Sequence, residues 1–240
     1  MFRHALLAAS SAAMLVFAGP ANALAAFDGF SFSEFGWEFD RPGVTVSTDF
    51  GILDANFSES GAGLVTEWAP DQFETTASAV TSGSVAGQVS APFGAASAFL
   101  LTDVLVSFVN EGPDLVTLSY SWRIGGVAQV LVEDPATEIA EVGAFATVFG
   151  EFFDASGARS VVIDAEGFAF ANDFFPDDLF DDFVADDIVL EPGASLDVFM
   201  TADQDGFAEV AVGAVPLPAA APLLLAGLAA FGAAAVRRRR

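Results

Sequence analysis

Hydrophobic and polar side chains alternate one by one through much of the chain between residues 26 and 214. In the clearest stretch, Val116, Leu118, Tyr120 and Trp122 are separated by small polar residues. Successive side chains of a β-strand point to opposite faces, so this period of two predicts a half-buried strand. The same alternation recurs in segments whose apolar positions are Leu196, Val198 and Met200, then Val161 and Ile163, then Phe30 and Phe32, and then Phe35, Trp37 and Phe39.

Turn-forming residues separate these stretches, and they favour turns because they tolerate or impose the backbone angles that turns need. The predicted turns are Glu111-Gly112-Pro113-Asp114, Gly125-Gly126, Asp154-Ala155-Ser156-Gly157, Glu191-Pro192-Gly193 and Asp203-Gln204-Asp205-Gly206. Many short strands with such turns predict an all-β fold, an antiparallel β-sandwich of Ig-like or jelly-roll-like type. Residues 188–198, with the sequence IVLEPGASLDV, also resemble the strand, Pro-Gly turn and strand pattern of Ig-like surface domains.

One segment departs from the period of two. Residues 174–188 read FFPDDLFDDFVADDI, in which pairs of aspartates separate the apolar residues. This spacing fits one face of a helix. Pro176 suits a first helical turn, and Asp177 and Asp178 suit its positive end. The segment is therefore predicted to form a short amphipathic helix, with an acidic loop as the alternative.

The first residues have the features of a secretory signal peptide. A positive start at Arg3 and His4 precedes the apolar stretch 5–18, which is too short for an ordinary membrane span. Small residues in A-x-A spacing follow, so cleavage is predicted after Ala23 or Ala25. Signal peptidase is thus an expected partner, and the mature chain loses its only histidine.

The end of the chain combines a proline-containing motif, an apolar run and a cluster of arginines. The run 219–236 contains 18 uncharged residues, which as a helix measure about 27 Å, close to the hydrocarbon thickness of a bilayer. Positive charge stays on the cytoplasmic side, so the arginines orient the domain outward. The motif residues are Val215, Pro216, Leu217, Pro218 and Ala219, and the cluster is Arg237, Arg238, Arg239 and Arg240.

This three-part tail resembles the VPLPA-CTERM sorting signal of the wider PEP-CTERM group of bacterial exported proteins. The resemblance implies a second partner, an exosortase, which is a membrane-embedded transpeptidase-like protease. It also implies a precursor anchored in the inner membrane whose domain reaches the cell surface or extracellular matrix. Pro216 and Pro218 keep the motif extended, as a protease requires. The resemblance covers the tail alone and carries no information on the preceding domain.

The chain thus divides into a signal peptide (1–25), an acidic β-sandwich domain (26–214) and a sorting tail (215–240) that contains a predicted transmembrane helix (219–236). All 33 Asp and Glu residues lie between Asp28 and Glu209, where only Arg41, Arg123 and Arg159 oppose them. A surface this negative repels nucleic acid, so no nucleic-acid partner is expected. The chain has no cysteine, which excludes disulfides and thiolate metal sites.

The predicted mature chain has no His, Lys or Cys, so it lacks the usual nucleophile–base pairs, Schiff-base lysines and His-ligated metals. We assign no catalytic residue, metal ligand or cofactor, and calcium is the one ion considered, because carboxylates are plentiful. Asp203-Gln204-Asp205-Gly206 followed by Glu209 resembles a fragment of a calcium loop, and Asp177, Asp178, Asp181 and Asp182 form a second cluster. The leading interpretation is a non-enzymatic surface or matrix protein. The alternatives are a calcium- or carbohydrate-binding module and a carboxylate-dependent hydrolase.

Overall fold

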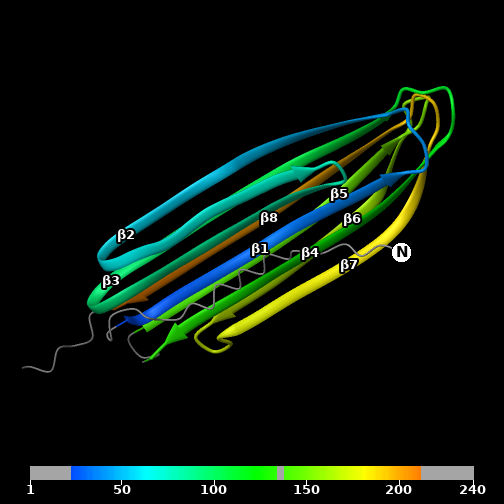
Figure 1. Ribbon diagram of the computed structural model, residues 1–240. Helices are drawn as coiled ribbons and strands as arrows, with labels where there is room; N and C mark the ends of the chain where they lie inside the picture. The colour runs from blue at the N-terminus through cyan, green and yellow to red at the C-terminus, as the bar shows by residue number, and fades with distance from the viewer. Residues whose placement is uncertain (1–22, 134–137, 212–240) are drawn as a thin grey trace, which may run out of the picture. The chain divides into compact units, whose positions relative to one another are not determined.

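The computed structural model describes residues 23–133 and 138–211, and these residues form one antiparallel β-sheet without a helix (Figure 1). The predicted antiparallel all-β class is confirmed. The strands are β1 (Ala23–Phe39), β2 (Val44–Thr75), β3 (Ser78–Asn110), β4 (Val116–Val132), β5 (Glu138–Phe153), β6 (Arg159–Asn172), β7 (Asp177–Leu190) and β8 (Ser195–Val210).

Strand β3 belongs to both halves of the sheet. Its residues 78–90 pair with β1, and its residues 94–109 pair with β8. Strand β2 is divided between the two halves in the same way. Its residues 63–75 pair with the first part of β3, and its residues 44–61 pair with the second part. The hydrogen-bonded order is β6-β5-β8-β3-β1-β4-β7, with β2 alongside β3. The sheet therefore folds over at β3 and is nearly closed into a barrel.

Glycines make this fold-over possible. Gly61 has φ of +60°, a left-handed conformation that other residues rarely adopt, and a Cβ there would lie 2.5 Å from Phe93 O. A Cβ on Gly94, its partner in β3, would lie 2.5 Å from Ala62 N and 2.6 Å from Ser60 O. The two backbones approach this closely only because neither position has a side chain.

The two halves of the sheet face each other as layers. The first layer contains β1, β4, β7 and residues 63–75 and 78–90, and the second contains β5, β6, β8 and residues 44–61 and 94–110. Ser33 Oγ of β1 donates a hydrogen bond to Thr201 O of β8 at 2.6 Å. Phe170 N of β6 donates to Asp178 Oδ2 of β7 at 3.1 Å. Inward side chains therefore fill the space between the layers.

The core consists of two apolar clusters separated by a belt of buried polar side chains. Phe35 and Phe108 belong to one cluster, and Phe27 and Leu100 to the other. The fully buried belt residues are Ser31, Ser33, Thr81, Thr102 and Gln204. Thr81 Oγ1 donates to Thr102 Oγ1 at 2.8 Å, and Gln204 Nε2 donates to Ser31 Oγ. Buried polar groups are costly without partners, so these bonds help to fix how the layers face each other.

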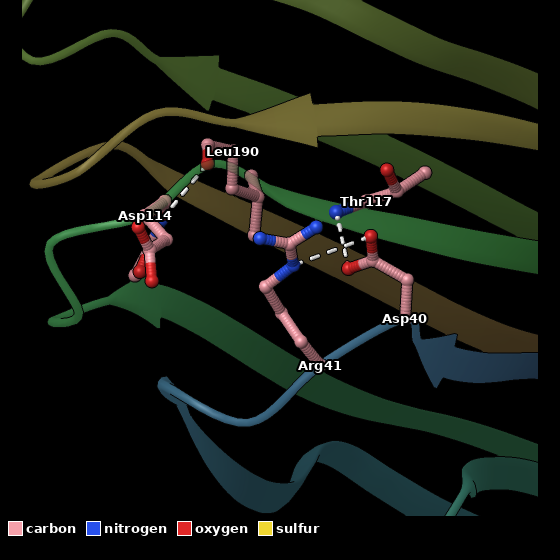
Figure 2. A network of polar contacts seen from close by, with 6 residues as sticks. Asp40, Arg41, Asp114, Thr117 and Leu190 are labelled. Carbon is pink, nitrogen blue, oxygen red and sulfur yellow. Dashed lines mark hydrogen bonds and ion pairs between the residues drawn. The ribbon is translucent and has the colours of Figure 1, made fainter.

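At one end of the sheet, Asn110 connects two of the predicted turns. Its Nδ2 donates to Asp114 O and to Leu190 O, both at 2.8 Å. Figure 2 shows this end, where Asp40 Oδ1 accepts a hydrogen bond from Thr117 N at 2.9 Å. The turns predicted at 111–114, 154–157 and 191–193 are confirmed, because each lies between two strands.

The predicted helix over residues 174–188 is wrong, because most of this segment is β7. It pairs with β4 from Asp177 opposite Gln129 to Leu190 opposite Val116. A pair of aspartates fits a strand as well as a helix, since it puts one carboxylate on each face of the strand. Pairing with the neighbouring strand decides between the two structures, as it often overrides local preference.

Two of the predicted turns are also wrong, because they lie inside strands. Gly125 and Gly126 belong to β4, where an added Cβ would meet the ring of Phe32 at the first and of Phe180 at the second. The segment 203–206 belongs to β8, where the ring of Phe27 lies against Gly206. In each case glycine makes room for an aromatic ring and does not bend the chain.

A candidate binding site on the outer face of the second layer

The outer face of the second layer places aromatic and acidic side chains next to each other. Strand register puts Asn56, Phe99, Asp205 and Gly143 side by side across β2, β3, β8 and β5. The next row contains Ser58, Ser97, Phe207 and Glu141. These side chains point outward, because the residues between the rows in β3, β8 and β5 are buried.

The two rows line a shallow hollow of about 290 Å³, which we call the outer hollow. Its lining residues are Asn56, Phe57, Ser58, Ser97, Ala98, Phe99, Glu141, Asp205, Gly206 and Phe207. All of these except Phe57, Ala98 and Gly206 belong to the two outward rows. The carboxylate of Asp205 lies over Gly143, where a Cβ would overlap Asp205 Oδ1. Ser58 Oγ and Ser97 Oγ form a hydrogen bond of 3.0 Å on the β2 side. The outer hollow thus combines two phenyl rings, two carboxylates and three neutral polar groups.

The outer hollow is negatively charged. The arginines of the described domain pair with acids elsewhere, namely Arg41 with Asp40, Arg123 with Asp181 and Arg159 with Glu151. Within residues 23–133 and 138–211, neither Asp205 nor Glu141 forms an ion pair. Two carboxylates without a cationic partner favour a positively charged ligand and repel an anionic one.

Asp203 lies beside the outer hollow, two residues before Asp205 on β8. Burial raises the pKa of Asp203 to about 6, and the negative charge of Asp205 adds to the rise. Asp203 Oδ1 is buried and has no hydrogen-bond partner among the described residues. The charged form of Asp203 is therefore costly, and a cation bound nearby would reduce that cost.

The predicted calcium-loop fragment is a strand and not a loop. Asp203 and Asp205 face outward from β8, whereas Gln204 between them is fully buried. A calcium loop needs ligands that converge on one point, but alternate side chains of a strand are about 7 Å apart along one face. Within the part of the chain that the structure describes, no three Asp, Glu, His or Cys side chains gather where they could hold a metal ion.

The second predicted acidic cluster is divided between the two faces of β7. Asp181 binds Arg123 of the neighbouring strand through two hydrogen bonds of 2.8 Å. Asp178 instead accepts a hydrogen bond from Phe170 N of β6, in the other layer. Because side chains alternate along a strand, Asp177 lies on the same face of β7 as Asp181, and Asp182 lies on the same face as Asp178. The four carboxylates therefore do not form one site.

The predicted cleavage positions lie at the start of β1. Ala23 is its first residue, and Ala25 is fully buried and pairs with Val132. Residues 1–22 lie outside the described residues, as do Val215, Pro216, Leu217, Pro218, Ala219 and Arg237 to Arg240. In the described ranges, no helix is long and apolar enough to cross a membrane.

Most residues of the outer hollow, including Asn56, Phe99, Glu141 and Phe207, were not predicted from the sequence as site residues. Alternation was a usable signal, because it can place each of them on one face of its strand. Which of these residues become neighbours depends on strand order and register, and the order β2-β3-β8-β5 joins segments that are far apart in the sequence.

No protein-family model matches this chain, and a search of curated proteins found no similar sequence. The function must therefore be inferred from the chemistry of the outer hollow and from the sequence at the two ends of the chain.

Proposed function

We propose that this chain is an exported, non-enzymatic protein of the bacterial cell surface or extracellular matrix. The signal peptide delivers it, and the tail holds the precursor in the inner membrane until an exosortase-like protease acts. The order of motif, apolar run and arginine cluster at 215–240 carries this proposal. The strands support it as well, because they begin at Ala23, at the predicted cleavage positions, and end at Val210, before the predicted sorting tail.

The intact mass of the protein recovered from its native host tests this proposal. We expect the loss of the first 23 or 25 residues and a second cleavage in or near residues 215–219. A protein that retains Met1 and the complete tail would contradict both steps.

The arginine cluster provides a second test. Replacement of Arg237 to Arg240 with glutamine removes the charge that keeps the tail on the cytoplasmic side, so the variant should be missorted. Replacement with lysine retains the charge and serves as the matched control. Normal processing of the glutamine variant would argue against the sorting function of the tail.

A role as a surface binding module is the second candidate for the domain, and the outer hollow favours it. The hollow brings together the side-chain types that recognise small polar ligands, namely aromatic rings and a few polar groups. An antiparallel sandwich of Ig-like or jelly-roll-like type remains part of this proposal, and the turn at 191–193, which joins β7 of the first layer to β8 of the second, supports it. Calcium and carbohydrate are the two ligand classes to distinguish.

Thermal melting of the full-length chain in sodium, magnesium and calcium chlorides at equal ionic strength distinguishes these ligands. We expect each salt to raise Tm by screening the acidic surface, with calcium adding little to this effect. A large shift specific to calcium, lost in Asp205→Asn, would instead identify a calcium module.

A further inference from the structure

We propose that the outer hollow binds an amino sugar, a hexosamine residue with a free ammonium group. The inference rests on the proposed role of the domain as a binding module and adds the class of ligand. It follows from three properties of the lining side chains: their charge, their aromatic rings and their neutral polar groups.

The charge of the outer hollow calls for a cation. Asp205 lies opposite Gly143 and Phe207 lies opposite Glu141, so the two carboxylates are diagonal neighbours on β8 and β5. Diagonal neighbours on one face of an antiparallel pair are about 7–8 Å apart, within reach of a group placed between them. An ammonium in that position faces both carboxylates, and neither of them forms an ion pair within residues 23–133 and 138–211.

The aromatic rings decide which kind of cation fits. Phe99 and Phe207 are diagonal neighbours on β3 and β8, so they line the outer hollow beside the carboxylates. Calcium requires six to eight oxygen ligands, and phenyl rings supply none. An organic ammonium is attracted by the face of an aromatic ring as well as by a carboxylate. The mixed lining therefore suits an ammonium better than a metal ion.

The neutral polar side chains favour a sugar as the carrier of the ammonium. Asn56, Ser58 and Ser97 line the β2 side of the outer hollow, and each can both donate and accept hydrogen bonds. The hydroxyl groups of a sugar ring match them, whereas the alkyl chain of a lysine would leave them without partners. The volume of about 290 Å³ is at the lower end for ligand pockets and suits a single small ring.

Isothermal titration calorimetry of the full-length chain in detergent micelles tests this inference with three probes. These are a glucosamine tetramer, the N-acetylglucosamine tetramer and a tetralysine peptide. The first two differ in the charge and acetylation of the nitrogen. We expect the glucosamine tetramer to bind about tenfold more tightly than either of the others, with an affinity that falls as salt is added.

A pair of double variants separates local recognition from general attraction to an acidic protein. Asp205→Asn with Glu141→Gln preserves side-chain shape and should weaken binding of the glucosamine tetramer about tenfold. Asp197→Asn with Glu166→Gln removes the same charge from other outward positions of β8 and β6 and should change affinity less than about twofold. Phe207→Leu, with the fold checked by circular dichroism, should also weaken binding.

Each other result has a distinct meaning. Equal binding of the acetylated tetramer would overturn recognition of the ammonium and retain a sugar-binding module. Equal binding of tetralysine would overturn the amino sugar in favour of a basic peptide. Equal weakening by the two double variants would assign the effect to overall charge, against this site. If no probe binds, the binding-module role fails too, while the proposal of export, tested by intact mass, still stands.

Discussion

In the first layer, strands β2 and β7 are the two edge strands, and each pairs with a single neighbour, β3 and β4 respectively (Figure 1). Unpaired strand edges invite association with other chains. Strand β2 is irregular, with three register shifts, a fold-over at Gly61 and a proline at position 70. Strand β7 pairs without a shift but contains six aspartates. We infer that irregular geometry protects the β2 edge from association with other chains, whereas negative charge protects the β7 edge.

The two edges also differ in their electrostatics. Burial raises the pKa of Asp28 to about 6, and Glu67 of β2 adds to the rise. Burial and then Asp49 of β2 raise the pKa of Asp103. On β7, the hydrogen bonds from Arg123 lower the pKa of Asp181. Acids of β2 thus add repulsion to carboxyls that are already desolvated, whereas an acid of β7 has a cationic partner.

The largest expected effect comes from breaking the geometry of β2 with Gly61→Val. The new side chain must adopt φ near +60° and meet the backbone of β3. We expect a loss of about 3 kcal/mol or more in the free energy of unfolding, measured by denaturant titration. Gly157→Ala is the matched control, because Gly157 also has positive φ, at +81°, but with open space around it. It should cost about 1 kcal/mol. Equal losses of unfolding free energy in the two variants would mean that the close approach of β2 and β3 at Gly61 does not contribute to stability.

The next prediction removes charge from β7. Replacement of Asp182, Asp186 and Asp187 with threonine leaves a regular edge with three of its six aspartates, beside Leu179 and Phe183, whose exposed fractions are 71% and 60%. We expect self-association at concentrations at least about tenfold lower than for the parent chain, measured by light scattering.

The same change of charge on β2 provides the comparison. Replacement of Asp54, Asp71 and Glu74 with threonine should leave the association behaviour unchanged, because the register shifts and Pro70 still interrupt that edge. Association of the β2 variant alone would reverse our assignment of which edge depends on charge.

Stability should depend on pH in a way that sharpens the electrostatic comparison. Asp28 and Asp203 each have a folded pKa of about 6, above their unfolded value near 4, so the folded state binds protons more tightly between these values. Tm should therefore rise as the pH is lowered from about 7 to about 5 at constant ionic strength. Below about 4 it should fall, because Asp181, whose folded pKa is lowered, loses its stabilising charge.

The variant Glu67→Gln tests the contribution of β2 to this profile. It removes the negative charge that adds to the pKa rise of Asp28, so Tm should change less between pH 5 and pH 7. If Tm instead rises steadily from pH 5 to pH 7, neither Asp28 nor Asp203 has a raised pKa in the folded protein.

The smallest expected effect concerns Arg123, the cationic partner on the β7 side. Its guanidinium pairs with Asp181 and lies 5.5 Å from the centre of the Phe32 ring. Arg123→Met should cost about 0.5–1 kcal/mol, since the pair is partly exposed. Arg41→Met is the control, because Arg41 is more exposed than Arg123 and lies 3.5 Å from Asp40 in a longer contact, so it should cost less. Equal costs would mean that the bidentate contact adds nothing.

Local patterns of the sequence determined much of the fold. The alternation at residues 116–122 predicts the first part of β4, and that at 195–201 predicts the first part of β8, because the period of two is a property of a single extended chain. The Pro-Gly turn at 191–193 is equally local, since these residues impose turn geometry wherever they occur. The predicted leader and sorting tail likewise depend on short contiguous segments.

Tertiary structure alone decided the features that join distant segments. Residues 177–188 fit a helix or a strand, and pairing with β4 selected the strand. Gly125 and Gly206 led to predicted turns, but they lie inside β4 and β8, where the rings of Phe32 and Phe27 from β1 pack against them. The outer hollow needs Asn56, Phe99, Glu141 and Asp205 to meet across β2, β3, β5 and β8. The physical reason is that strand register is set by hydrogen bonds and packing between segments, which no single segment encodes.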